Sequence, residues 1–171
     1  MKMYQLPLKK WILSGLLCLL TSMALAKESA DAQVFIGVVD YAQDSQASQY
    51  GVQYLTAERW TPFDFRPVIG LMRTRYASHY VFAGLTRESK FSTKDTGFLL
   101  SVDFAPGLYL HGGNEDVNLG FWLQFRSGVN LVYEFADHTR IGLGYHHLSN
   151  ASLAEENPGT ETLTITYSVR L

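Results

Sequence analysis

Residues 120–135 read GFWLQFRSGVNLVYEF, and their alternation decides the fold class. Successive side chains of a β-strand point to opposite faces, so apolar and polar residues at alternating positions separate onto two faces. The apolar face would carry Phe121, Leu123, Phe125, Val129, Leu131, Tyr133 and Phe135, and the other face Gln124, Arg126, Asn130 and Glu134. The stretch therefore predicts one long strand with an apolar and a polar face.

The rest of the chain repeats this pattern in short segments separated by turn-rich breaks, without a helical period. In residues 97–110, for example, Phe98, Leu100, Val102 and Phe104 alternate with Ser101 and Asp103. The expected strands cover about residues 33–41, 49–56, 65–76, 79–87, 97–110, 120–135, 139–149 and 160–171. The sequence predicts an all-β protein of eight antiparallel strands.

A soluble barrel and a membrane barrel can share this alternation. The apolar face points inward to the core in a soluble barrel and outward to lipid in a membrane barrel. The interior of an eight-stranded barrel is only wide enough to be filled by side chains, so inward Phe and Tyr residues in these numbers would crowd it. Small residues at Gly128, Gly142 and Gly144 would instead leave room for inward Arg126 and Glu134, which would need to pair. We therefore expect a transmembrane β-barrel of the bacterial outer membrane.

The amino terminus favours export. Residues 1–26 have a positive start, an apolar core from Trp11 to Met23 and a small-residue cleavage site at Ala24-Leu25-Ala26, which is typical of a secretory signal peptide. Its removal would leave one barrel domain, residues 27–171, without the only cysteine, Cys18. Three lysines would leave with it, so the formal charge would change from −2 to about −5. That charge does not suggest a nucleic-acid partner.

With both termini on one side, the connections of eight strands alternate between two ends of the barrel. The short turn at Asp137 and His138 would then face the periplasm. The segments 150–160 and 111–118 would lie at the opposite, extracellular end.

The last two strands bring together three residue types that can hydrolyse an ester. Alternation places His147 and Ser149 on one face of the first strand and Glu161 on the matching face of the second. Closing this hairpin about residue 155 puts Ser149 opposite Glu161, with His147 one step further along. A serine hydroxyl needs a base to accept its proton, and a carboxylate orients that base, so these residues form a candidate triad.

The connecting loop supplies candidate donors for an oxyanion. The side chains of Asn150 and Asn157 and the backbone amides around Ser152 lie next to the triad in sequence. His79, His111 and His138 are scattered without metal-ligand spacing, so no metal or other cofactor is expected.

His147-Leu148-Ser149-Asn150, followed by Asn157 and Glu161, resembles the signature of the lipid A 3-O-deacylase (PagL) family of outer-membrane esterases. The resemblance implies that Ser149 is the nucleophile, His147 the base and Glu161 the orienting carboxylate, with Asn150 and Asn157 on the oxyanion side. It also implies lipid A in lipopolysaccharide as the substrate and release of the ester-linked acyl chain at the 3-position. A glycine is expected two residues after Asn150, where this chain has Ser152.

Two other functional classes fit parts of the pattern. A non-catalytic outer-membrane barrel with a structural or adhesive role would account for everything except the Ser, His and Glu convergence. A soluble lipocalin-like carrier would need the apolar faces to point inward. The sequence leaves the oligomeric state open, with a homodimer as one option beside contacts with outer-membrane lipids.

Overall fold

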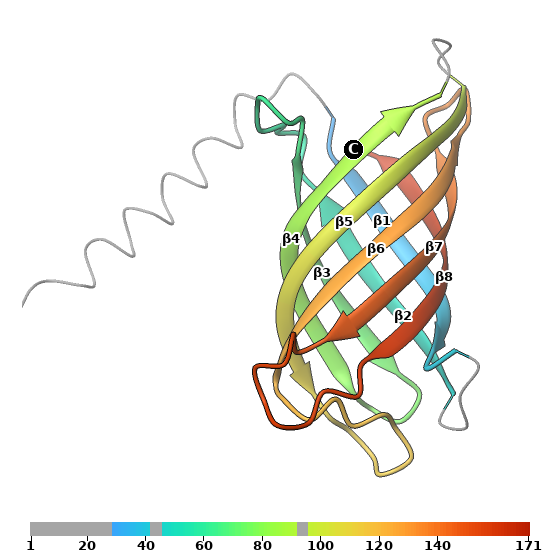
Figure 1. Cartoon of the computed structure of the whole chain (residues 1–171). Helices are drawn as coiled ribbons and strands as arrows, with labels where there is room; N and C mark the ends of the chain where they lie inside the picture. The colour runs from blue at the N-terminus through green and yellow to red at the C-terminus, as the bar shows by residue number, and fades with distance from the viewer. Residues whose placement is uncertain (1–28, 42–45, 92–95) are drawn as a thin grey trace, which may run out of the picture.

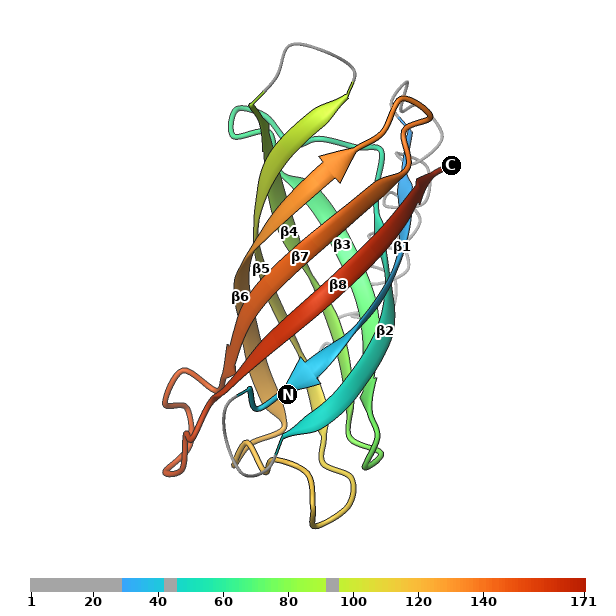
Figure 2. The ribbon, with the colours of Figure 1, turned by 90° about the vertical axis from the view of Figure 1, so that its right-hand side faces the viewer.

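The computed structural model describes residues 29–41, 46–91 and 96–171, and it shows a closed antiparallel barrel of eight strands (Figure 1). Each strand pairs with its neighbour in sequence, and β8 returns to pair with β1 (Figure 2). The strands are β1 (Asp31–Val39), β2 (Ala47–Leu55), β3 (Arg66–Thr74), β4 (His79–Lys90), β5 (Gly97–Leu110), β6 (Leu123–Glu134), β7 (Arg140–Ser149) and β8 (Thr160–Arg170). The predicted fold class is confirmed.

The predicted signal peptide, residues 1–26, lies outside the described residues. Within the described ranges, no helix has the length and apolar character needed to span a membrane.

The strand boundaries differ from prediction where the backbone turns. β1 ends at Val39 because Asp40 adopts a φ of 60°. This left-handed conformation cannot continue a strand. β6 begins at Leu123, three residues later than predicted, and Gly120 has a φ of 73°. The inward and outward sets of side chains are unchanged, because only the ends of the strands move.

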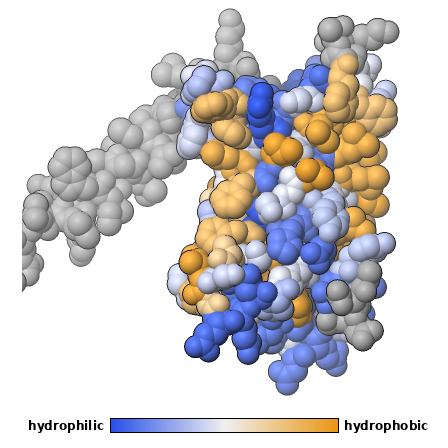
Figure 3. Space-filling view, viewed as in Figure 1, coloured by the Kyte–Doolittle hydropathy of each residue, from blue (hydrophilic) through white to orange (hydrophobic). Residues whose placement is uncertain are grey.

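The outer surface of the barrel is apolar. Direct partners on neighbouring strands form an aliphatic row across β5, β6, β7, β8 and β1, and all of its members are exposed: Leu100, Leu131, Leu143, Ile165 and Ile36. Figure 3 shows hydrophobic side chains over both flanks, with hydrophilic ones along the middle of this face and at its lower end. The apolar faces therefore point outward, as a lipid-facing barrel requires. The soluble-carrier alternative, which needed them inward, is wrong.

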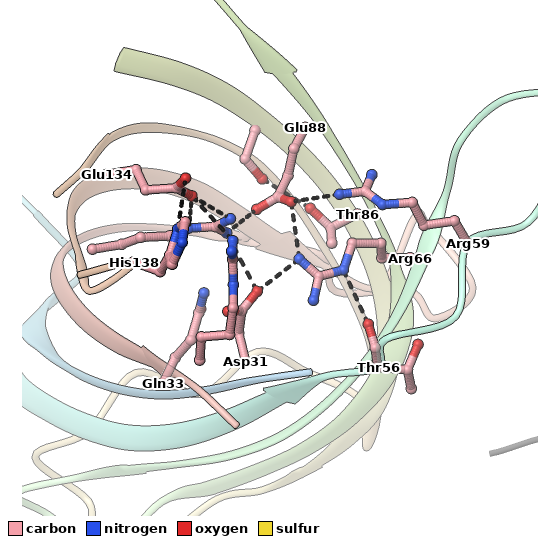
Figure 4. Close-up of polar contacts among 12 residues, drawn as sticks. Asp31, Gln33, Thr56, Arg59, Arg66, Thr86, Glu88, Glu134 and His138 are labelled. Carbon is pink, nitrogen blue, oxygen red and sulfur yellow. Dashed lines mark hydrogen bonds and ion pairs between the residues drawn. The ribbon is translucent and has the colours of Figure 1, made fainter. Parts of the chain in front are cut away.

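The inside of the barrel near the start of β1 and the end of β8 holds a network of buried charges (Figure 4). The Arg66 guanidinium lies 2.7 Å from Asp31 and 2.9 Å from Glu88, and the Arg140 guanidinium lies 2.6 Å from Glu134. Charges in a narrow interior are costly unless they are paired and hydrogen-bonded. The Arg66 and Asp31 pair joins β3 to β1, and Arg140 also lies 2.9 Å from Glu88, which joins β7 to β4. The network thus connects strands that are not neighbours in the barrel wall.

A second polar cluster lies midway along the interior. Asp103 on β5 accepts hydrogen bonds from Arg126 at 3.2 Å and Asn130 at 2.9 Å, and its carboxylate lies 3.2 Å from Nε2 of His146. Arg126 also lies over the ring of Phe82, 4.1 Å from its centroid. Arg126 and Glu134 are both paired, but not with each other, since Arg126 binds Asp103 and Glu134 binds Arg140.

The two ends of the barrel differ in their connections. One end carries the start of β1, the end of β8 and the turn between β6 and β7, where hydrogen bonds from the hydroxyl and amide of Thr139 lower the pKa of Asp137. The opposite end, which we call the loop end, carries residues 111–122 and 150–159 (Figure 1). Next to these loops, the inside of the barrel is filled by an apolar cluster that includes Tyr80, Tyr109, Leu119 and Leu148. No open channel is needed for a site on the outer wall.

Candidate active site

The candidate triad lies on the outer wall at the loop end. Along β7, burial alternates from Ile141 to Ser149, with Gly142, Gly144, His146 and Leu148 buried and the odd-numbered residues at least partly exposed. His147 and Ser149 therefore face outward, as alternation predicted. Across the hairpin, Glu161 is also outward and 35% of its side chain is exposed, against 45% for His147. The three residues share one face.

The register of the hairpin differs from the predicted one. His147, and not Ser149, is the direct partner of Glu161, so the hairpin closes about residue 154. The prediction was wrong by two positions in pairing, an even number, so every side chain kept its face. The change brings the two residues that must touch into contact, since Nδ1 of His147 lies 3.1 Å from Oε1 of Glu161.

The imidazole of His147 extends over Gly159. A Cβ placed on Gly159 would lie 2.9 Å from Cε1 and 3.5 Å from Nε2 of His147. Continuing the register one step beyond the Leu148 and Thr160 pair places Gly159 across from Ser149. The ring edge that carries Nε2 is therefore directed toward the Ser149 end of the hairpin, while Nδ1 is bound to Glu161.

The Ser149 hydroxyl has no hydrogen-bond partner in the part of the chain that the structure describes. Residues i and i+2 of a strand stand about 6.6 Å apart at Cα, so the two side chains are neighbours on their face. Catalytic hydrogen bonds are often long or unformed without substrate. On the other side, the β6 partner of Ser149 is Phe125, whose ring stacks with Phe104 at a centroid distance of 5.9 Å. Ser149 thus lies between the imidazole and an aromatic lipid-facing surface.

The loop after Ser149 begins with a tight turn. The amide of Leu153 donates to the carbonyl of Asn150 at 3.0 Å, and Ala151 and Ser152 have φ of 54° and 61°. Two successive left-handed residues are typical of a type I′ turn, in which glycine is favoured. This conformation explains why a glycine was expected at position 152.

Asn150 does not lie where a donor toward the substrate is required. Its side chain is fully buried, and its Nδ2 donates to the carbonyl of Leu119 at 3.3 Å and to that of Glu156 at 2.7 Å. The alternation that turns Ser149 outward turns Asn150 inward. The side chain of Asn150 thus anchors the loop, and its expected oxyanion role is not supported by its position.

Asn157 and Ser152 remain on the solvent side of the loop. Asn157 is exposed, and its Oδ1 accepts a hydrogen bond from the Asn150 amide at 2.9 Å, which leaves its Nδ2 as a free donor among the described residues. Ser152 is exposed as well, and its backbone amide makes no backbone hydrogen bond within these residues. Both groups can reach a ligand beside Ser149 only from the outer surface.

Sequence reasoning missed Gly159 as part of the site. Gly159 was predicted only to lie in the loop between the last two strands, and it adopts a φ of 65°. Its second property, contact with the imidazole, depends on the register and could not be derived from composition. The residues of the described ranges include no group of three His, Cys, Asp or Glu side chains that could hold a metal ion.

A family model described as lipid A 3-O-deacylase (PagL) matches residues 37–170. The chain belongs to this family. Lipid A deacylase PagL of Bordetella bronchiseptica is 38% identical over 53 residues, which cover 31% of this chain and 30% of that protein. The local match thus spans less than a third of the length of that relative.

Solved structures support the fold independently. The crystal structure of the outer membrane enzyme PagL is similar with a TM-score of 0.69 at 17% identity, covering 82% of this chain and 99% of that one. Neisserial surface protein A (NspA) is similar with a TM-score of 0.52 at 12% identity, covering 84% and 96%. At these identities the likeness concerns the fold alone. PagL family membership and the lipid-facing barrel together place the chain in the bacterial outer membrane.

Proposed function

We propose that this PagL family member hydrolyses the ester bond that holds the 3-hydroxyacyl chain at the 3-position of lipid A, by a serine esterase mechanism. One observation carries the proposal: a His and Glu pair, bonded at 3.1 Å, lies beside Ser149 on the lipid-facing wall. A polar group in this position is unfavourable unless it is paired or near the headgroups. Its presence on an otherwise apolar surface favours a role in chemistry.

The first half of the reaction forms an acyl-enzyme. Glu161 accepts a hydrogen bond from Nδ1–H of His147, which leaves Nε2 without a proton and able to act as a base. The Ser149 oxygen attacks the ester carbonyl as its proton passes to Nε2. The tetrahedral intermediate then collapses, and His147 returns the proton to the sugar oxygen that leaves.

The second half restores the enzyme. A water molecule gives a proton to Nε2 and attacks the acyl carbonyl, and the Ser149 oxygen leaves with that proton. The free 3-hydroxy fatty acid is the product. During both halves the Ser152 amide and Asn157 Nδ2 stand on the exposed side, where they would donate to the oxyanion.

The location of the site defines how substrate arrives. The loop end lies opposite the start of β1 and the end of β8, and we assign it to the extracellular side, so the triad would stand at the level of the outer leaflet. Lipid A in that leaflet would reach Ser149 by lateral diffusion, without entering the barrel. An outward-facing site needs no pore, which agrees with the closed interior.

The test is the mass of lipid A after expression of the chain in a bacterium without such activity. We expect the loss of one hydroxyacyl group with the parent chain, and no loss with Ser149→Ala or His147→Ala. Glu155→Gln, which alters an exposed loop carboxylate, is the matched control and should behave as the parent. Unchanged lipid A with a correctly folded parent would support the non-catalytic barrel, and activity of Ser149→Ala at the parent rate would exclude this mechanism.

A further inference from the structure

Two arginines at the end of β3 stand apart from the other cations of the barrel. Arg73 faces outward, on the same face of β3 as the exposed Ile69 and Leu71. Arg75 follows two residues later, and its amide donates to the carbonyl of Ser48 at 2.9 Å, which extends the pairing of β2 with β3. Arg75 therefore stays on the same side as Arg73. Both are exposed, and both lie at the loop end, where β3 finishes.

This rim arginine pair, Arg73 and Arg75, has no carboxylate partner among the residues that the structure describes. Interior guanidiniums behave differently, since Arg66, Arg126 and Arg140 each form ion pairs. The contact of Arg75 is the ring of Tyr76, 4.7 Å from its centroid, which holds the side chain without neutralising it. Two positive charges are thus presented to the surroundings of the barrel.

The surface around the pair suits the headgroup region of a lipid leaflet. Tyr50 on β2 and His79 on β4 are the direct partners of Arg73, and Tyr50 is 53% exposed. One step toward the middle of the barrel, the outward residues are aliphatic: Val52, Leu71 and Val81. An amphiphile could place acyl chains on the aliphatic residues and its anionic group on the arginines.

No other lysine or arginine of the described chain faces outward at the loop end. Arg87 also faces outward, but it lies on β4 nearer the terminal end, after the strand has crossed the barrel wall. The predicted mature chain carries a formal charge of about −5, that is −2 without three lysines, so repulsion from an anionic leaflet is expected elsewhere. The rim arginine pair is where an anion can bind favourably.

We propose that the rim arginine pair binds the phosphate groups of a phosphorylated glycolipid in the outer leaflet, at a site separate from the catalytic triad. Strands β1 and β2 separate β3 from β8 on one side, and β4, β5 and β6 separate it from β7 on the other. Guanidinium groups bind phosphate by two parallel hydrogen bonds, which gives geometric selectivity as well as charge. This lipid would fix the depth and orientation of the barrel. The inference depends on the outer-membrane location and not on the esterase mechanism.

A fluorescence titration tests the proposal on the folded mature protein in detergent. The only cysteine in the sequence is Cys18, in the predicted signal peptide, so Ile69→Cys can carry an environment-sensitive dye four residues before Arg73. The titration uses a Ser149→Ala background, so that the ligand is not altered. The probes are lipid A with two phosphates and the same lipid after removal of its phosphates.

We expect replacement of each arginine by glutamine to weaken binding of the phosphorylated lipid about fivefold, and the double variant about 25-fold, as for one unit of charge near an anionic headgroup. Arg87→Gln, the outward arginine at the other end, should bind as the parent does. Lysine at both positions keeps the two charges and should restore the part of the affinity that is due to charge, which controls for folding. Equal affinity of the double glutamine variant and the parent, or equal affinity for the dephosphorylated lipid, would overturn the proposal.

Discussion

Nδ1 of His147 and Oε1 of Glu161 lie 3.1 Å apart because the two residues are direct partners across the β7–β8 hairpin. Neighbouring strands hold side chains on one face within reach without help from a loop. The contact therefore depends on the strand pairing and not on the conformation of a loop. Orientation of the imidazole by a carboxylate is the part of a triad that this contact provides.

Replacing Glu161 by Gln should lower kcat by roughly 10³- to 10⁴-fold, because an amide can hold the wrong imidazole tautomer and cannot stabilise the imidazolium. The pair is partly exposed, so the thermal midpoint should change little. Release of 3-hydroxy fatty acid from lipid A and a thermal melt measure the two effects. A Glu156→Gln control should leave both unchanged, and a Glu161→Gln enzyme as fast as the parent would remove Glu161 from the mechanism.

Replacing Gly159 by Ala should impair the reaction without removing any catalytic group. The new Cβ would lie 2.9 Å from Cε1 of His147, and the φ of 65° disfavours any L side chain. The imidazole must then shift away from Ser149, so we expect kcat to fall at least tenfold with a smaller change in KM.

Gly113→Ala is the matched control for Gly159→Ala. Its Cβ would meet its nearest neighbour at 3.4 Å, an ordinary contact, and Gly113 is in a loop at the same end. This variant should keep the parent kcat. Full activity of Gly159→Ala would show that the contact with the ring does not position it.

Replacing Ser152 by Gly should preserve activity, because the proposed donor at this position is the backbone amide. Glycine tolerates the φ of 61° that costs an L residue about 1 kcal/mol, so stability should be equal or higher. Initial rates and a thermal melt test this, with Ala154→Gly as a loop control. A tenfold loss of kcat in Ser152→Gly would instead assign the function to the hydroxyl.

The sequence was sufficient to predict which side chains of the last hairpin share a face. It was insufficient to predict which residues of its two strands are direct partners. Alternation placed His147, Ser149 and Glu161 on one face, because the period of a strand is two, and the narrow interior of an eight-stranded barrel indicated that this face points outward. The register depended on the loop, in which Ala151 and Ser152 turn the chain directly after Asn150. β7 ends at Ser149 and β8 begins at Thr160, and the pairing of Leu148 with Thr160 centres the hairpin on residue 154 and not on 155. Glu161 therefore faces His147 and not Ser149.

For the barrel interior, the sequence predicted which charged residues are buried but not which residues they bind. Alternation indicated that Arg126 and Glu134 would be buried and would need partners, but it could not identify them. Arg140 and Asp31 are 109 residues apart in sequence and bind across the lumen at 3.3 Å. Such contacts depend on strand tilt and on which strands face one another inside the barrel. The alternation of apolar and polar residues along a strand predicts neither.

Removing Asp103 tests whether this interior is held by paired charges. The carboxylate binds Arg126, Asn130 and His146, and Arg126 is 7% exposed. Asp103→Leu should lower the free energy of unfolding by about 3–5 kcal/mol, because it leaves a buried guanidinium uncompensated. The double variant Asp103→Leu with Arg126→Leu should recover much of this loss. Urea unfolding in lipid vesicles measures both, and a single variant as stable as the parent would mean that water already satisfies Arg126 in the lumen.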